Sequence, residues 1–62
     1  MNVSNMTLDY AKEQWENEHS WENTRSYLKT LMDYHEDDMI SNATFLSELD
    51  DISIVMKHIY YL

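Results

Sequence analysis

Residues 45–59, FLSELDDISIVMKHI, carry apolar side chains at the spacing of one face of an α-helix. Steps of four, three, four and three residues separate the members of this series, which are Phe45, Leu49, Ile52, Met56 and Ile59. Such a heptad seam predicts a helix over residues 42–61 with one apolar side. A β-strand over residues 52–61 is the alternative, because several β-branched residues lie there. The strict alternation that a strand needs breaks at Val55-Met56, so we favour the helix.

The spacing of apolar residues also predicts a helix over residues 7–18. Leu8, Ala11 and Trp15 fall three and four residues apart, which places them on one stripe. Thr7 precedes this stripe and is a suitable N-cap, because its hydroxyl can accept a hydrogen bond from an unpaired amide of the first turn.

A helix is further predicted over residues 20–37, with Ser20 as its N-cap. The step from Trp15 to Trp21 is six residues, which turns the apolar stripe by about a third of a helical turn. One continuous helix with two apolar faces would explain this change of phase, and so would a break near residues 18–20. We favour the break, and therefore expect an all-α fold. The whole chain, residues 1–62, is then a single small domain built as a three-helix bundle.

Composition supports a helical domain and excludes several kinds of site. The 62 residues include no glycine, proline or cysteine, so there is no glycine-rich phosphate loop, disulfide or thiolate zinc site. Asn42 follows the second helix, and we expect an asparagine to take the left-handed conformation that glycine would adopt at a helix end. With 44% hydrophobic and 13% aromatic residues, the chain is too apolar for a disordered acidic segment.

Aromatic residues are numerous for so small a core, with two tryptophans, five tyrosines and one phenylalanine. We expect Trp15, Trp21 and Phe45 to fill the core and the tyrosines to lie at its margin. Tyr60 and Tyr61 are expected to be exposed, because a final helical turn cannot easily bury several large side chains. Since tyrosine is a favoured anchor in protein interfaces, these two residues are candidate partner-binding residues.

Charge gives the clearest indication of function. Twelve acidic residues against four basic ones give a net charge of −8, which disfavours direct binding to nucleic acid or to an anionic membrane. Two groups of acids are candidate contacts for a basic groove on another protein: Asp9, Glu13 and Glu16 on the first helix, and Glu36, Asp37 and Asp38 at the end of the second. The alternative is that the acids serve only solubility and that the second group forms a solvated turn.

No catalytic, cofactor or metal site is predicted. Glu16-x-x-His19 matches half of a di-iron helix signature, but the second Glu-x-x-His that such a site needs is absent. The three histidines, His19, His35 and His58, lack the spacing of metal ligands. General acid–base chemistry also needs a pocket, which a bundle of this size seldom has. We therefore expect a protein that is not an enzyme.

In size and charge the chain is similar to the small acidic helical inhibitors that phages and mobile elements encode, some of which imitate DNA. This similarity implies a non-enzymatic inhibitor that blocks a larger nucleic-acid-binding or host-defence protein by occupying its basic surface. The alternative is a self-associating structural or regulatory module, a homodimer whose seam at residues 45–59 pairs with its own copy. No secretion signal and no apolar span are visible, so we expect a cytoplasmic protein, in the host cytoplasm if a phage encodes it.

Overall fold

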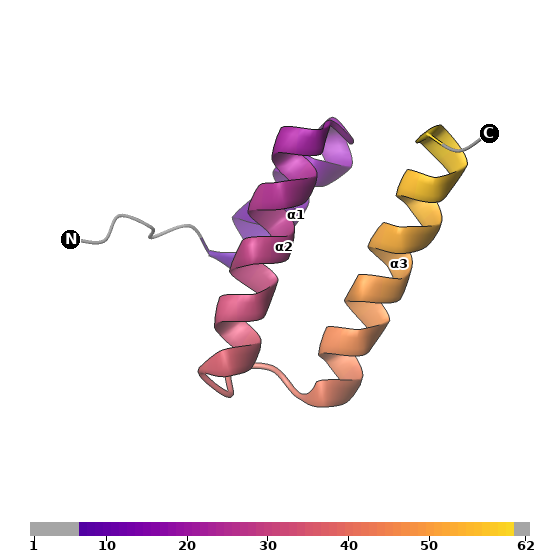
Figure 1. Ribbon diagram of the computed structural model, residues 1–62. Coiled ribbons are helices and arrows are strands. Elements are labelled where there is room, and N and C mark those ends of the chain that lie inside the picture. Colours follow the sequence, from indigo (N-terminus) through magenta and orange to yellow (C-terminus); the bar gives the residue numbers. More distant parts are fainter. Residues whose placement is uncertain (1–6, 61–62) are drawn as a thin grey trace.

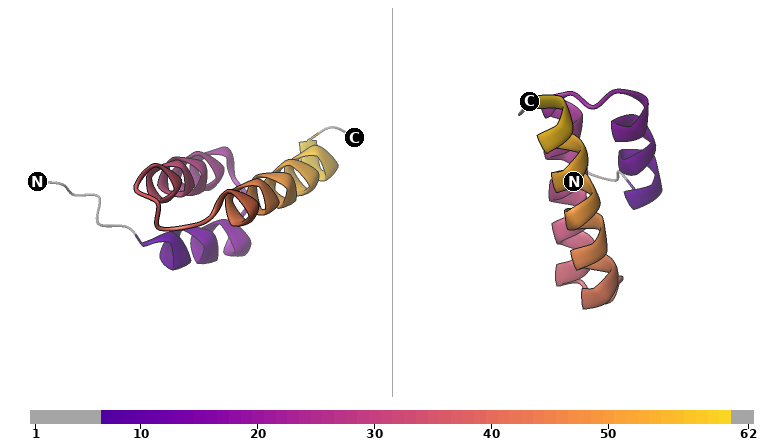
Figure 2. Two further views of the ribbon diagram at one scale, coloured as in Figure 1. Left: turned by 90° about the horizontal axis from the view of Figure 1, so that it is seen from below. Right: turned by 90° about the vertical axis from the view of Figure 1, so that its right-hand side faces the viewer.

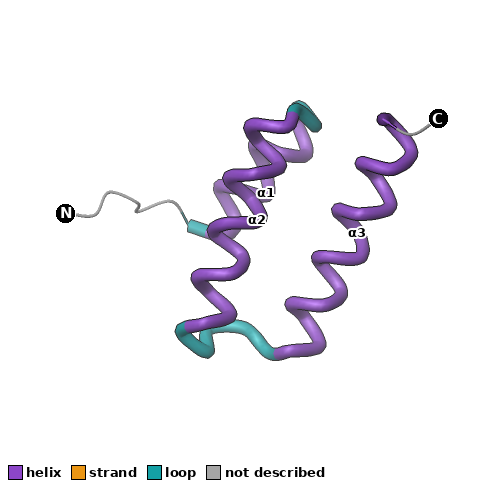
Figure 3. Tube along the Cα trace, viewed as in Figure 1, coloured by secondary structure: helices purple, strands orange, loops and turns teal. Residues whose placement is uncertain are grey.

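The computed structural model describes residues 7–60, which form three α-helices and no strand (Figures 1 and 3). The helices are α1 (Leu8–Asn17), α2 (Trp21–Glu36) and α3 (Asn42–Tyr60). Each lies within the range that its apolar spacing predicted. The all-α, three-helix architecture is therefore confirmed.

The break between α1 and α2 is also confirmed, and polar side chains close it without a glycine. Ser20 caps α2, since its hydroxyl accepts a hydrogen bond of 3.0 Å from the amide of Asn23. The side-chain amide of Asn23 donates back to the carbonyls of Gln14, at 3.1 Å, and Glu18, at 2.9 Å. His19 Nδ1 lies 2.6 Å from the carbonyl oxygen of Trp15. The carbonyls at the end of α1 thus have side-chain partners where a helix often uses a left-handed residue.

The connection between α2 and α3 is closed by backbone hydrogen bonds instead of side-chain ones. Asp38 has φ of 60°, and it is the one residue of 7–60 with a positive φ. The amide of Asp38 donates to the carbonyl of His35, and the amide of Met39 donates to that of Tyr34, which is the Schellman pattern. The expectation that an asparagine takes the left-handed conformation here is wrong. Aspartate also tolerates it, and Asn42 is already the first residue of α3.

Helix α2 is the central element, and α1 and α3 pack along different sides of it (Figures 1 and 2). Successive helices run in opposite directions, as short connections require. No Cα atom of α1 comes within 8 Å of one in α3, so only side chains join these two helices. The molecule is flat, with a smallest Cα extent of 13 Å. As a result, α1 and α3 each have one side without a neighbouring helix.

Each helix contributes two apolar residues to the core, which is formed by Ala11, Trp15, Tyr27, Leu31, Ile52 and Met56. Thr24 is also buried, where its hydroxyl accepts a hydrogen bond of 3.1 Å from the indole nitrogen of Trp15. Along the predicted seam of α3, Phe45 and Leu49 are half-buried and Ile59 is exposed.

The prediction for the aromatic core is right for Trp15 and wrong for Trp21. Trp21 is 60% exposed, whereas Tyr27, expected at the margin, is fully buried. Trp21 is the first residue of α2 and stacks on Tyr60 of α3, with ring centroids 4.8 Å apart. Tyr27 lies six residues further along, which is about one and two-thirds helical turns, and there it packs against Trp15.

Candidate functional site

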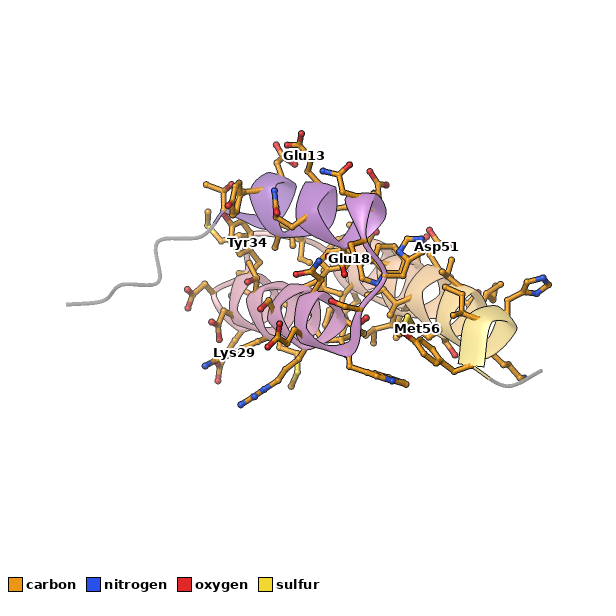
Figure 4. The ribbon with its side chains drawn as sticks, turned by 90° about the horizontal axis from the view of Figure 1, so that it is seen from above. Glu13, Glu18, Lys29, Tyr34, Asp51 and Met56 are labelled. Carbon is orange, nitrogen blue, oxygen red and sulfur yellow. The ribbon has the colours of Figure 1, made fainter. Side chains whose placement is uncertain are left out.

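The acidic stripe of α1 consists of Asp9, Glu13 and Glu16, and all three residues are exposed. Glu13 points away from α2, and Lys29 points away from α1 on the other side (Figure 4). Within residues 7–60, none of the three carboxylates forms an ion pair. Asp9 also lies in the first turn of α1, where a negative charge is favourable beside the helix N-terminus. This stripe offers three free carboxylates to a partner.

A second acidic group, Glu36, Asp37 and Asp38, forms the acidic turn between α2 and α3. All three residues are exposed, which agrees with the solvated turn considered from the sequence. Their charges crowd the C-terminal end of α2, where the helix dipole disfavours them. Asp38 additionally holds the left-handed conformation, which is unfavourable for a residue with a Cβ atom. This turn therefore gives up some stability while presenting three carboxylates.

Only one carboxylate of the described residues forms an ion pair and a hydrogen bond with side chains of the other helices. Glu48 of α3 is half-buried and accepts a hydrogen bond from the hydroxyl of Tyr27, while Lys12 Nζ of α1 lies 3.3 Å from its Oε1. Burial, and next the hydrogen bond to Glu48, raise the pKa of Tyr27 well above its usual range. We call Lys12, Tyr27 and Glu48 the polar triad. It has one member on each helix, so it joins α1 to α3 across α2.

The remaining acids all reach solvent. Every acidic side chain except Glu48 is exposed, and the three other cations, Arg25, Lys29 and Lys57, form no ion pair within residues 7–60. The net charge of −8 is thus carried almost wholly by free surface carboxylates. Such a surface attracts cationic partners over a distance set by the ionic strength.

The C-terminal aromatic anchor lies at the other end of the molecule from the acidic turn. Tyr60 is exposed, and its hydroxyl donates to the carbonyl of His19 at 3.2 Å. With Trp21 it borders a hollow of about 560 Å³, lined by Trp21, Ser53, Met56, Lys57 and Tyr60. Tyr61, the other predicted anchor, lies outside the described residues.

The predicted contact residues therefore do not gather in one site. Tyr60 and the acidic turn are separated by the length of α2, about 24 Å for its 16 residues. Trp21 was predicted to lie in the core, but it lies on the surface beside Tyr60. Its place directly after the N-cap Ser20 was the available signal, because the first residue of a helix is the least enclosed by neighbouring turns.

Two of the three histidines take structural positions in this fold, and His58 is exposed. His19 bonds to the end of α1, and His35 stacks on Phe45 while its Nε2 meets the side chain of Asn42. In the part of the chain that the structure describes, no three His, Asp or Glu side chains are grouped to hold a metal ion. Nor does any helix of residues 7–60 combine the length and apolar character needed to cross a membrane.

Comparisons with protein-family models, with curated proteins and with solved structures give no match for this chain. The surface chemistry of the three helices is therefore what indicates a function.

Proposed function

We propose that this protein is a non-enzymatic inhibitor that binds a basic surface on a larger protein, of the nucleic-acid-binding or host-defence class. The free carboxylates of the acidic stripe and the acidic turn make the contact. We place this activity in the cytoplasm, in that of the host if a phage encodes the chain. The observation that carries the proposal is that every acid but Glu48 is exposed, while one ion pair alone is formed within residues 7–60.

The spacing of the acidic stripe supports competition with nucleic acid. From Asp9 to Glu16 the helix rises about 10 Å, so neighbouring carboxylates are about 5 Å apart along the axis. Phosphates along one strand of duplex DNA follow each other at about 3.4 Å of axis. The two spacings differ by less than the reach of lysine and arginine side chains, so a groove of such residues that binds successive phosphates can also pair with these carboxylates.

The acidic turn supports the same proposal through its local energetics. Charges at the C-terminus of α2 and a left-handed aspartate both oppose folding. Sites where a protein departs from favourable local choices are often functional. A basic partner would neutralise these charges and remove the repulsion among them.

Apolar contacts complete the interface in this proposal. Tyr60 and Trp21 present a stacked aromatic pair at the end of the molecule distant from the acidic turn. Buried aromatic anchors commonly hold a complex together, whereas charges chiefly set the association rate and the choice of partner. The carboxylates would thus select a basic partner, and the aromatic pair would slow its release.

The test is capture of proteins from host lysate on the immobilised chain. We expect retained proteins to be enriched in nucleic-acid-binding proteins, to elute at moderate salt and to be displaced by added duplex DNA. The variant E36Q/D37N/D38N should retain less. A matched control, E18Q/D33N/D51N, removes the same charge from exposed positions outside the two acidic groups and should retain nearly as much as the wild type.

Capture that ignores salt and DNA, and that is equal for both triple variants, would contradict the proposal. Equal loss in the two variants would also contradict it, because net charge alone would then explain the binding.

A further inference from the structure

The outward face of α3 has no covering helix. This name denotes seven exposed residues that lie at helical spacing on one side of α3, away from its buried residues, namely Ala43, Leu46, Ser47, Asp50, Ser53, Ile54 and Lys57. Asp51 and His58 are also exposed and flank this face, outside it. Leu46 is 61% exposed and Ile54 is 58% exposed. The left panel of Figure 2 shows α2 beside α3 on one side, and the right panel shows α3 in front of α2.

This face differs in charge from the rest of the molecule. Asp50 and Lys57 are its single acid and single base, so its net charge is zero, although the chain carries −8. The acidic stripe of α1, by contrast, carries three carboxylates and no base. Two copies that meet through the outward face of α3 therefore repel each other less than two copies that meet through α1.

Two shallow hollows follow each other along α3 and share Ser53. The first, of about 650 Å³, is lined by Ala43, Leu46, Ser47, Leu49, Asp50 and Ser53. The second is the hollow of about 560 Å³ beside Trp21 and Tyr60. Short alanine and serine side chains line the first hollow together with the larger Leu46 and Leu49. Such alternation of small and large residues lets one helix receive the side chains of another.

We propose that the outward face of α3 binds a second copy of this chain, with the two α3 helices antiparallel and a twofold axis between Ser53 and Ile54. In this register Asp50 of each copy lies opposite Lys57 of the other. The single acid and the single base of the face then form two equivalent ion pairs. Self-complementarity of this kind is what a twofold interface requires.

The same register brings Ile54 of each copy beside Ile54 of the other at the twofold axis, so that an aliphatic side chain that is 58% exposed in the single chain becomes covered in the dimer.

The buried side of α3 is a different surface. Ile52 and Met56 of the heptad seam pack within the chain, so the outward face can be occupied without opening the core. The dimer leaves the acidic stripe of α1 and the acidic turn uncovered, so the carboxylate contacts proposed above do not depend on it.

Sedimentation equilibrium of the full chain tests the dimer. We expect the average mass to rise from 7.5 kDa toward twice that value with concentration. Added NaCl should raise the dimer fraction, because it screens the repulsion between two chains of charge −8. Ile54→Glu should weaken association by about tenfold or more. Met32→Glu, on α2 and also 58% exposed, is the matched control and should leave association unchanged.

A charge exchange tests the register. Asp50→Lys and Lys57→Asp should each weaken the dimer, since each places like charges opposite one another. The double variant should restore it, which no arrangement without this pairing predicts. Circular dichroism of each variant establishes that its helices remain.

Three results would overturn the proposal. They are a monomeric mass at every concentration and salt, equal association of Ile54→Glu and the wild type, and failure of the folded double variant to recover. If Ile54→Glu does not fold, the charge exchange decides the question alone.

Discussion

Helices α1 and α3 both pack on α2, but they differ in how they are held and in what they turn to the solvent. Helix α1 is short and polar, and Ala11 and Trp15 anchor it to α2. Its outer side carries the acidic stripe. Helix α3 is longer and more apolar, yet only Ile52 and Met56 of its residues are buried. Its outward face is neutral and partly apolar.

This difference separates the two contacts proposed above, which composition alone cannot distinguish. A uniformly acidic surface would suggest solubility or one kind of basic partner. Here the acidity is concentrated away from one helix face, and that face also has the hollows and exposed aliphatic side chains typical of contact surfaces. We therefore expect salt to weaken contacts through α1 and to strengthen contacts through α3.

The anchoring of α1 is the part of the comparison with the largest expected effect. Trp15→Ala should lower the free energy of unfolding by about 3–5 kcal/mol, because it leaves a cavity and removes the hydrogen bond to Thr24. For a chain of 62 residues this loss should abolish cooperative unfolding at room temperature. Thermal melts followed by circular dichroism measure it.

Trp21→Ala is the matched control for that experiment. Trp21 is 60% exposed, so its loss removes mainly the stacking on Tyr60, worth about 1 kcal/mol. Equal destabilisation by the two substitutions would contradict the assignment of Trp15 to the core and Trp21 to the surface.

The polar triad joins the two helices that the comparison contrasts. Tyr27→Phe should lower the free energy of unfolding by about 2 kcal/mol, since it removes a buried hydrogen bond to a carboxylate. Chemical denaturation measures the change. Tyr34→Phe is the control, because the hydroxyl of Tyr34 makes no hydrogen bond within residues 7–60, and it should change stability by less than about 0.5 kcal/mol. If Tyr27→Phe leaves the free energy of unfolding unchanged, the polar triad does not hold α1 and α3 together.

Alkaline pH probes the same link without mutation. The pKa of Tyr27 is raised in the folded chain, so above pH 10 the unfolded chain loses this proton while the folded chain retains it. Stability contributed by Tyr27 is complete below that pH and declines above it, by at most about 1.4 kcal/mol per pH unit. Denaturation curves from pH 9 upward should show this decline for the wild type relative to Tyr27→Phe. Parallel pH profiles would exclude the effect.

The turn that connects α2 to α3 gives the smallest expected effect. Asp38→Gly should raise the free energy of unfolding by about 1 kcal/mol, because glycine adopts the left-handed conformation freely and the substitution removes a charge from the end of α2. Asp37→Gly removes an equal charge from a residue with φ of −89° and should not stabilise. Melting temperatures of the two variants report the difference, and a lower melting temperature for Asp38→Gly would contradict the strain at this residue.

Helix positions in this protein follow from local chemistry, which the sequence states directly. Thr7 and Ser20 cap their helices as predicted, and the phase change between Trp15 and Trp21 marks the break. Contacts between helices do not follow from spacing. Lys12 and Glu48 are far apart in the chain, so no periodicity indicates that they meet. The burial of Tyr27 also depends on where α1 and α3 pack, since α2 has apolar residues over a wide arc.

The candidate contact surfaces were predictable in part. The exposure of the acids follows from their charge, and the structure places each predicted group on the surface. That these acidic groups lie far from Tyr60 could not be predicted, because it depends on the direction in which α2 runs. The neutral outward face of α3 could also not be predicted. The packing of Ile52 and Met56 in the structure shows which side of that helix is left uncovered.

Amide chemical shifts of the ¹⁵N-labelled chain test the central contrast most directly, since one spectrum reports both outer surfaces. Addition of an arginine-rich peptide should move the signals of Asp9, Glu13, Glu16 and residues 36–38. Raising the protein concentration should move those of the outward face of α3, from Ala43 to Lys57. If both titrations move the same residues, or if the peptide moves α3 and concentration moves α1, the assignment of different contacts to the two helices is wrong.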